Sequence, residues 1–239
     1  MKHLCTAFAL FVLTACTGAE QRGESVAVQP APTIATDPVP ARIDSLRRAS
    51  RPGDLLLRLG DDMMSYSIRY LSESDPSYSH VGLLIQRKGE LQVAHIGPYP
   101  NGGDTLRYEP IDSFINPATN LEAGLYRFRI SEAERERFLN NVQAWGRKGV
   151  HFDYAYDLRT DGQLYCTELI AKSLAPATAN RIHFSGMQVP ASMRKLMYAF
   201  LSQTVPDTAE VRSRRYIALD QLYRSAYCDS ILKIQLRNQ

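Results

Sequence analysis

The sequence predicts an α+β domain in which a small antiparallel sheet packs against helices. Two apolar runs, "YSHVGLLIQ" and "LQVAHI", flank the turn "RKGE" and indicate a hairpin. The stretch "LYRFRI" alternates apolar with basic residues, which is typical of a strand with one buried face. A capping box at Ser131 and Glu134, an apolar stripe with Phe138 and Val142, and a stop at Gly149 indicate a long helix.

The remaining elements follow from the same kinds of pattern. An apolar run at Leu55–Leu59 comes after a Pro-Gly turn and predicts the first strand. Met64, Ile68 and Leu71 then recur at helical spacing, and Asp61 or Asp62 can cap this helix. "TLRYEP" predicts a short third strand, and "LYCTELIAKSL" and "PASMRKLMYAFL" predict helices. "RYIALDQLYRS" and "ILKIQL" predict a terminal strand or an extended closing segment.

The N-terminus predicts export and membrane attachment. Residues 1–15 combine a short charged start, an apolar run too short to span a bilayer, and small residues before Cys16, as a signal peptide does. The ending "LTAC" resembles the bacterial lipobox, so we expect Cys16 to be lipidated. The alternative is an ordinary signal peptide with a chance cysteine. We therefore expect a lipid-anchored protein of the bacterial cell envelope, on its periplasmic or extracytoplasmic face.

The chain is expected to hold one folded domain. Residues 16–45 are rich in Ala, Pro and Thr, so we expect a lipidated cysteine followed by a mobile tether. Residues 46–239 are long enough for one domain with a sizeable core. The formal net charge of +3 over the full chain becomes +2 once Lys2 leaves with the signal (3 − 1 = 2). So weak a charge does not favour nucleic acid as a partner.

The four cysteines leave two for the folded domain. Cys5 leaves with the signal peptide and Cys16 is the predicted lipid anchor, so Cys166 and Cys228 remain. In an exported protein these two could form a disulfide.

The predicted hairpin places two histidines on one face. If residue 87 pairs with residue 90, residue 80 lies across from residue 97, and His95 is two residues from that position. His80 and His95 then share a face as diagonal neighbours. Gly82 lies beside His80 on that face and lets another group approach closely. A lone histidine among apolar residues is commonly structural, but two on one face suit a base and the group that orients it.

Cys166 begins the predicted helix of "YCTELIAKSL" and shares a face with Leu169, Ile170 and Leu174. Its thiol therefore points toward whatever the helix packs on. The free N–H groups of a first helical turn and the helix dipole favour a thiolate, so we expect a lowered pKa for Cys166. The same N–H groups can hold an oxyanion. A cysteine at a helix start that faces a histidine on a sheet is the papain-type arrangement.

Several segments together carry a family resemblance. "RPGDLLLR", "SHVGLLI", the polar residue on the second hairpin strand, "FDYAYDL" and "YCTEL" resemble the YiiX/YebB-like family, a circularly permuted branch of the NlpC-type papain-like cysteine hydrolases. The resemblance implies a permuted papain-like fold, with a small sheet or barrel packed against helices. It implies Cys166 as nucleophile, His80 as base and His95 as orienter, at a position where many relatives have a different polar or acidic residue.

These features predict an envelope lipoprotein that cleaves an amide or related acyl bond through a Cys-His nucleophile. Cell-wall peptides are the first substrate expected. One alternative is an acyltransferase or lipid esterase on the same site. Another is a non-catalytic binding module at the membrane surface, with Cys166 tied to Cys228. No cofactor or metal is expected, because His80, His95 and Cys166 have no fourth ligand that the sequence can nominate, and neither CxxC nor HxxxH occurs.

Overall fold

The structure, a computed structural model, describes residues 33–34, 37–98 and 103–237. Its main sheet has the strand order β1-β11-β6-β2-β3-β4-β5 and is antiparallel throughout, apart from β1, which runs parallel to β11. The strands are β1 (Thr33–Ile34), β2 (Leu55–Gly60), β3 (His80–Arg87), β4 (Glu90–His95), β5 (Arg107–Pro110), β6 (Asn120–Phe128) and β11 (Cys228–Gln235). The fold is therefore the mixed sheet-and-helix class that the sequence predicts.

Two small sheets and the helices complete the fold. The sheets pair β7 (His151–Phe152) with β8 (Gln163–Leu164), and β9 (Met187–Gln188) with β10 (Arg215–Tyr216). The α-helices are α1 (Val39–Ala49), α2 (Met63–Ile68), α3 (Ile111–Phe114), α4 (Glu132–Lys148), α5 (Cys166–Ala177), α6 (Arg194–Leu201), α7 (Thr208–Ser213) and α8 (Leu219–Tyr223). The 3₁₀ turns are η1 (Arg69–Leu71) and η2 (Ala191–Met193).

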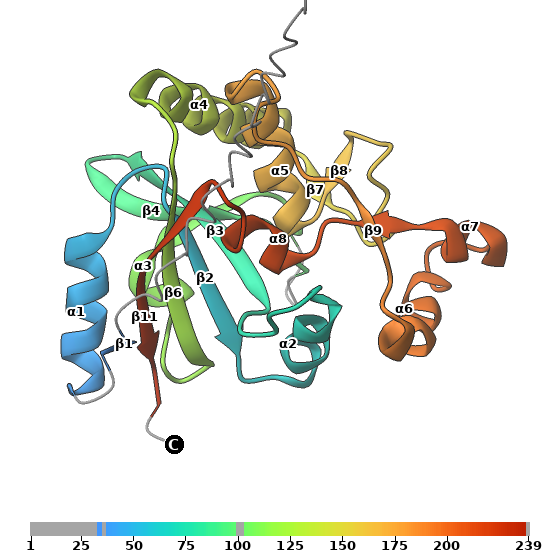
Figure 1. Cartoon of the computed structure of the whole chain (residues 1–239), viewed down its shortest axis with the longest axis horizontal. Helices are drawn as coiled ribbons and strands as arrows, with labels where there is room; N and C mark the ends of the chain where they lie inside the picture. Colours follow the sequence, from blue (N-terminus) through green and yellow to red (C-terminus); the bar gives the residue numbers. More distant parts are fainter. Residues whose placement is uncertain (1–32, 35–36, 99–102, 238–239) are drawn as a thin grey trace, which may run out of the picture.

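Strand alternation gives the main sheet two buried faces. On β2 and β3, Leu55, Leu57 and Val81 pack into the cluster that includes α4 and α5. Leu56 and Leu84 face the opposite way, toward α1 and α3. Figure 1 shows α1 beside the sheet at one edge of the view and α4 and α5 above it. The sheet is thus a central layer, and each face can carry its own chemistry.

The predicted hairpin register is confirmed. Arg87 pairs with Glu90 and Leu83 with Ala94, so the turn centres on Lys88 and Gly89 as expected. The predicted long helix is also confirmed as α4, with its capping box at Ser131 and a left-handed Gly149 at its end.

Two segments differ from expectation. The stretch "RYIALDQLYRS" contains the helix α8, because Leu219, Leu222 and Tyr223 are buried at helical spacing. Asp62 caps α2 as predicted, by accepting a hydrogen bond from the Ser65 N–H at 2.8 Å. However, α2 buries none of its own residues, and Met64 is 51% exposed.

The fold begins earlier than residue 46, where the sequence analysis places its boundary. Helix α1 starts at Val39 and packs on β11, with Leu46 buried. Arg42 is buried as well, and its Nη1 donates to the Gln235 carbonyl at 2.8 Å. Proline is compatible with the first turn of a helix, so the Pro-rich composition there concealed a helix start. The predicted signal peptide and Cys16 lie outside the described residues. None of the helices in the described ranges has the length and apolar character of a membrane span.

Candidate active site

The two predicted site histidines lie in contact. His80 Nε2 is 3.0 Å from His95 Nδ1, and the rings meet edge to face with centroids 5.2 Å apart. His95 is 1% exposed, and His80 is half-buried. The sequence prediction that both imidazoles share one face of the hairpin is therefore confirmed.

Glu109 extends this pair to a chain of three groups, the histidine relay of Glu109, His95 and His80. It lies on β5, where Glu109 pairs with Val93 and Arg107 pairs with His95. Its Oε1 is 2.7 Å from His95 Nε2. Burial is the largest single influence and opposes a charge on this carboxyl. The hydrogen bond from His95 and the charges of His95, Arg58 and Arg107 together outweigh it and lower the pKa of Glu109. Glu109 is therefore a carboxylate at neutral pH.

The relay dictates where its protons lie. Burial lowers the pKa of His95, and burial with the charge of Arg58 lowers the pKa of His80 well below 6.5, so both rings are neutral at pH 7. Because His95 Nε2 faces a carboxylate, it carries the ring proton, and His95 Nδ1 must accept. His80 Nε2 then donates to His95, which leaves His80 Nδ1 without a proton. His80 is thereby fixed in the tautomer that a general base requires.

Gly82 allows the relay to close. A Cβ on Gly82 would lie 2.3 Å from Val93 Cγ1 and 3.2 Å from His95 Cβ. The first distance is too short for two carbon atoms, so only glycine lets β4 approach β3 this closely at the relay. This agrees with the close approach expected from the sequence.

Arg58 and Phe114 surround the relay on the same face of the sheet. Arg58 pairs with His80 across β2 and β3, and its guanidinium lies 4.9 Å from the Phe114 ring centroid. It also donates to Asn120 Oδ1 at 2.9 Å. Phe114 contacts both imidazoles, with centroid distances of 5.7 Å to His80 and 5.0 Å to His95. The positive charge of Arg58 disfavours a second positive charge on either histidine.

Cys166 begins α5, as predicted, and is half-buried. It packs against the cluster on the α4–α5 face, whereas His80 and His95 contact Phe114 on the other face. The thiol lies near the start of β3, because the backbone N–H of Val81, the residue after His80, is among the groups that lower the pKa of Cys166. Within the described ranges no hydrogen bond joins Cys166 to His80. The structure thus brings the two histidines together and places the thiol at the same strand end.

The thiol does not have the lowered pKa that the helix start predicts. Burial raises the pKa of Cys166 to about 11. The N–H groups of Val81, Thr167 and Cys166 itself lower it, as does the charge of Arg58, but they do not offset the burial. The resting site therefore contains a neutral thiol and a neutral imidazole rather than an ion pair.

The first turn of α5 is firmly held. Glu168 is fully buried, accepts from the Tyr165 N–H at 3.3 Å and lies 2.9 Å from Lys172 Nζ. Thr167 Oγ1 donates to the Ile217 carbonyl at 2.7 Å, and the Ile217 N–H donates to the Tyr165 hydroxyl, also at 2.7 Å. The structure thus supports a capping role for Glu168 and a packing role for Tyr165.

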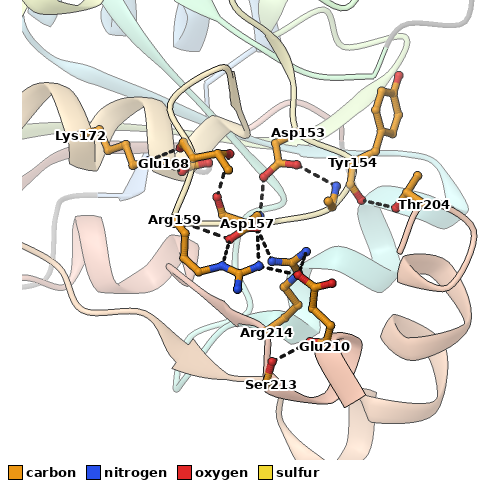
Figure 2. A network of polar contacts seen from close by, with 12 residues as sticks. Asp153, Tyr154, Asp157, Arg159, Glu168, Lys172, Thr204, Glu210, Ser213 and Arg214 are labelled. Carbon is orange, nitrogen blue, oxygen red and sulfur yellow. Dashed lines mark hydrogen bonds and ion pairs between the residues drawn. The ribbon is translucent and has the colours of Figure 1, made fainter. Parts of the chain in front are cut away.

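The loop between β7 and β8 is tied to α7 by a polar network (Figure 2). Asp153 accepts from the Ala155 N–H at 2.8 Å, and Asp157 accepts from Arg159 Nε at 2.8 Å and also pairs with Arg214. This loop holds Tyr156 at a φ of 50°, in the left-handed region, where the backbone of residues other than glycine is strained. Its ring stacks on Tyr165 with centroids 4.6 Å apart. The network therefore positions an aromatic side chain next to the start of α5.

Cys166 and Cys228 are both free thiols. Cys228 is buried on β11, where it pairs with Phe128 of β6.

Glu109 and Arg58 were not predicted as site residues from the sequence. Both lie in strands that were predicted, and the register of Arg58 against His80 could have suggested the second. The position of Glu109 depends on how β4 pairs with β5. The long loop between these strands does not fix that pairing, so its register could not be predicted. The charged residues of "TLRYEP" were the signal available for it.

Comparison with known proteins shows a fold. The crystal structure of the metalloprotein yiiX from Escherichia coli O157:H7, also labelled DUF1105, is similar to this chain with a TM-score of 0.57 and 16% sequence identity. The similarity covers 77% of this chain and 97% of that one. No protein-family model and no curated protein matches the sequence. The chain thus has a YiiX-like fold.

Proposed function

We propose that this chain is a cysteine hydrolase of the permuted papain-like, NlpC-type class, which attacks an amide or related acyl bond through Cys166. The observation that carries the proposal is the relay from Glu109 through His95 to His80, which leaves a lone pair on His80 Nδ1. A buried chain of this kind has little use in a structural core, where apolar side chains would pack at lower desolvation cost. It suits a base that must accept one proton.

In the proposed reaction His80 Nδ1 takes the proton of the Cys166 thiol as the sulfur attacks the acyl carbon. The positive charge that forms on His80 is stabilised through His95 by the carboxylate of Glu109. Hydrogen bonds between catalytic groups are often long in ligand-free enzymes and tighten in the complex, so substrate binding would close the gap between thiol and imidazole. The neutral pair in the resting site favours proton transfer during the attack, rather than a thiolate formed beforehand.

The first turn of α5 supplies the second part of the chemistry. The N–H groups of Cys166 and Thr167 influence the thiol. A tetrahedral intermediate on Cys166 would place its oxyanion among such donors at a helix start. The leaving group takes the proton from His80, and a thioester on Cys166 remains. Water, or another acceptor, then resolves that thioester.

The similar solved structure is that of a metalloprotein, which raises the question whether the relay could hold a metal ion. His95 uses both ring nitrogens, one toward His80 and one toward Glu109. In the described part of the chain, no group of three or more His, Cys, Asp or Glu side chains is arranged to hold a metal ion. With both His95 nitrogens engaged, the relay does not fit a metal centre.

The remaining parts of the proposal concern location and partners. We propose an envelope lipoprotein held to a membrane through Cys16, which acts on cell-wall peptides or on lipids. The alternative, a non-catalytic module with Cys166 tied to Cys228, is disfavoured by two free thiols and by the relay.

The hydrolysis of 4-nitrophenyl acetate tests the proposal with an acyl group too small to need a specificity pocket. We expect Cys166→Ala to remove the activity and His80→Ala to lower kcat/KM by about 10²–10⁴-fold. His183→Ala, on an exposed histidine away from the relay, serves as the matched control and keeps the native rate. Native rates in Cys166→Ala would overturn the proposal.

A further inference from the structure

A cavity of about 200 Å³ lies between the loop that joins β7 to β8 and the segment in which α7 leads into β10. It borders the polar network of Figure 2, which labels several of the residues in its wall. Three arginines and one aspartate line it, together with three uncharged residues: Asp157, Leu158, Arg159, Gly186, Ser213, Arg214 and Arg215. This cavity, called the arginine pocket here, therefore has an excess of positive charge in its wall.

Two of the guanidinium groups are held in place by shared carboxylates, as Figure 2 shows. Arg159 donates to Asp157 through Nε at 2.8 Å and through Nη2 at 2.7 Å, and Nη2 also donates to Glu210 at 2.5 Å. Arg214 pairs with the same two carboxylates, at 3.1 Å to Glu210 Oε1. The charge of Asp157 is thus balanced within the network. Both guanidinium groups are already ordered, so a ligand that binds them has little side-chain entropy to overcome.

The network does not use every arginine donor. Arg214 is 9% exposed, and its Nε is buried with no hydrogen-bond partner in the described part of the chain. A buried donor without a partner is unfavourable, and an acceptor oxygen brought to it removes that cost. Arg215 donates to the Gly186 carbonyl through Nε at 2.7 Å, and no other described residue accepts from its guanidinium. The wall of the pocket therefore presents oriented N–H groups that an anion could engage.

Gly186 lets the two sides of the pocket come together. A Cβ at this position would lie 2.5 Å from Leu158 Cδ1 and 3.0 Å from Arg215 Cβ. The first distance is too short for two carbon atoms, so a side chain here would displace Leu158 or Arg215. Displacement of Arg215 would also disturb its bond to the Gly186 carbonyl. The geometry of the pocket thus depends on a glycine in its own wall.

We propose that the arginine pocket binds the phosphate group of a phosphomonoester. Such a group carries about 1.5 to 2 negative charges at neutral pH and has three acceptor oxygens, whereas a carboxylate has one charge and two oxygens. Planar guanidinium groups bind pairs of phosphate oxygens with good geometry. Three arginines around one small cavity therefore suit a phosphate better than a carboxylate. The inference goes beyond the proposed hydrolase and does not depend on it.

Inorganic phosphate is the first probe, titrated by isothermal calorimetry into the full chain. We expect one saturable site per chain. Arg215→Gln and Arg159→Gln, both on exposed side chains, should weaken binding by at least about tenfold, because each removes a charge-assisted hydrogen bond to the anion. Arg212→Gln removes an exposed arginine of the same basic stretch that does not line the pocket, and this matched control should bind as the native chain does.

Arg159→Gln also breaks ion pairs with Asp157 and Glu210, so urea unfolding is measured for each variant. Arg215→Gln leaves all of those ion pairs in place and tests the pocket even where Arg159→Gln loosens the loop. Equal affinity in the native chain and Arg215→Gln, or no saturable binding by the native chain, would overturn the inference. Acetate that binds as tightly as phosphate would overturn the assignment to a phosphate group.

The source of the phosphate group is a separate arm. Glycerol 3-phosphate represents a soluble phosphomonoester, and dihexanoyl phosphatidic acid, used below its micellar concentration, represents a lipid headgroup. Similar affinities for both, each lost in Arg215→Gln, would assign a soluble ligand. At least tenfold tighter binding of the lipid, again lost in Arg215→Gln, would assign a headgroup. Affinities for both compounds that Arg215→Gln leaves unchanged would overturn the inference.

Discussion

The histidine relay differs in construction from the pocket of about 340 Å³ between α2 and α6, called the apolar pocket here. In the relay nearly every polar atom has a partner at a definite distance, and a single glycine separates contact from clash. The apolar pocket has almost no polar contacts, is lined by methionines, and leaves several large side chains in water. The relay lies on paired strands, which hold positions firmly, and the pocket on short helices. A rigid region suits proton transfer, whereas a lining rich in methionine can adapt its shape.

Glu109→Gln should break the relay and leave the pocket intact. An amide can donate as well as accept, so it no longer fixes the His95 proton on Nε2 and His80 Nδ1 is no longer held without a proton. The amide also lacks the negative charge that stabilises the positive charge forming on His80. We expect kcat with 4-nitrophenyl acetate to fall by about 10²–10⁴-fold. Glu90→Gln, at an exposed turn, is the control. A native kcat in Glu109→Gln would contradict the proton assignment.

The pH dependence of alkylation tests whether the Cys166 thiol and the His80 imidazole are both neutral in the resting site. Only the thiolate reacts with iodoacetamide, and the pKa of Cys166 is raised to about 11, so the thiolate fraction grows as the pH rises toward that value. Between pH 7 and pH 9 we expect the rate to increase about 100-fold, since each pH unit below the pKa changes the thiolate fraction tenfold. A rate that levels off near pH 6 would instead indicate a preformed ion pair.

Gly82→Ala should show how tightly the relay region is packed. The added methyl group would overlap Val93 and press on His95, so β4 would have to shift. We expect a loss of about 1–3 kcal/mol in the free energy of unfolding, measured with urea. Gly162→Ala has open space around its Cβ and an ordinary φ, and should change stability by less than about 0.5 kcal/mol. Similar values for both variants would contradict the close approach.

Met193→Leu should have the smallest effect of these variants, because the pocket lining tolerates a change of shape that the relay does not. Leucine keeps the volume and apolar character of methionine, and the lining is adaptable. We expect the free energy of unfolding, measured with urea, to change by less than about 1.5 kcal/mol. A larger loss would mean that the pocket is packed as rigidly as the relay.

The contrast also explains what could be predicted from the sequence. The hairpin register follows from a two-residue turn and period-two alternation, so His80 and His95 were placed together correctly. The helix that begins at Cys166 and the capped helix α4 follow from local signals. Glu109 was missed because its strand pairs across a long loop.

Two properties could not be predicted from any local pattern in the sequence. The apolar pocket joins α2 to α6, which are more than 120 residues apart, and only the tertiary fold brings them together. Burial raises the pKa of Cys166, whereas the helix dipole alone predicts that it is lowered. Burial is a sum over every neighbouring element, so a single segment cannot report it.

The acylation of Cys166 itself is the most direct test of the account. The native chain, with Cys166→Ala and His80→Ala beside it, is mixed with excess 4-nitrophenyl octanoate, quenched in acid and mapped by mass spectrometry of its peptides. We predict an octanoyl group on Cys166 in the native chain, a much slower appearance in His80→Ala, and none at residue 166 in Cys166→Ala. Release of nitrophenol by the native chain with no acyl group on Cys166 at any quench time, or at an equal rate in Cys166→Ala, would contradict it.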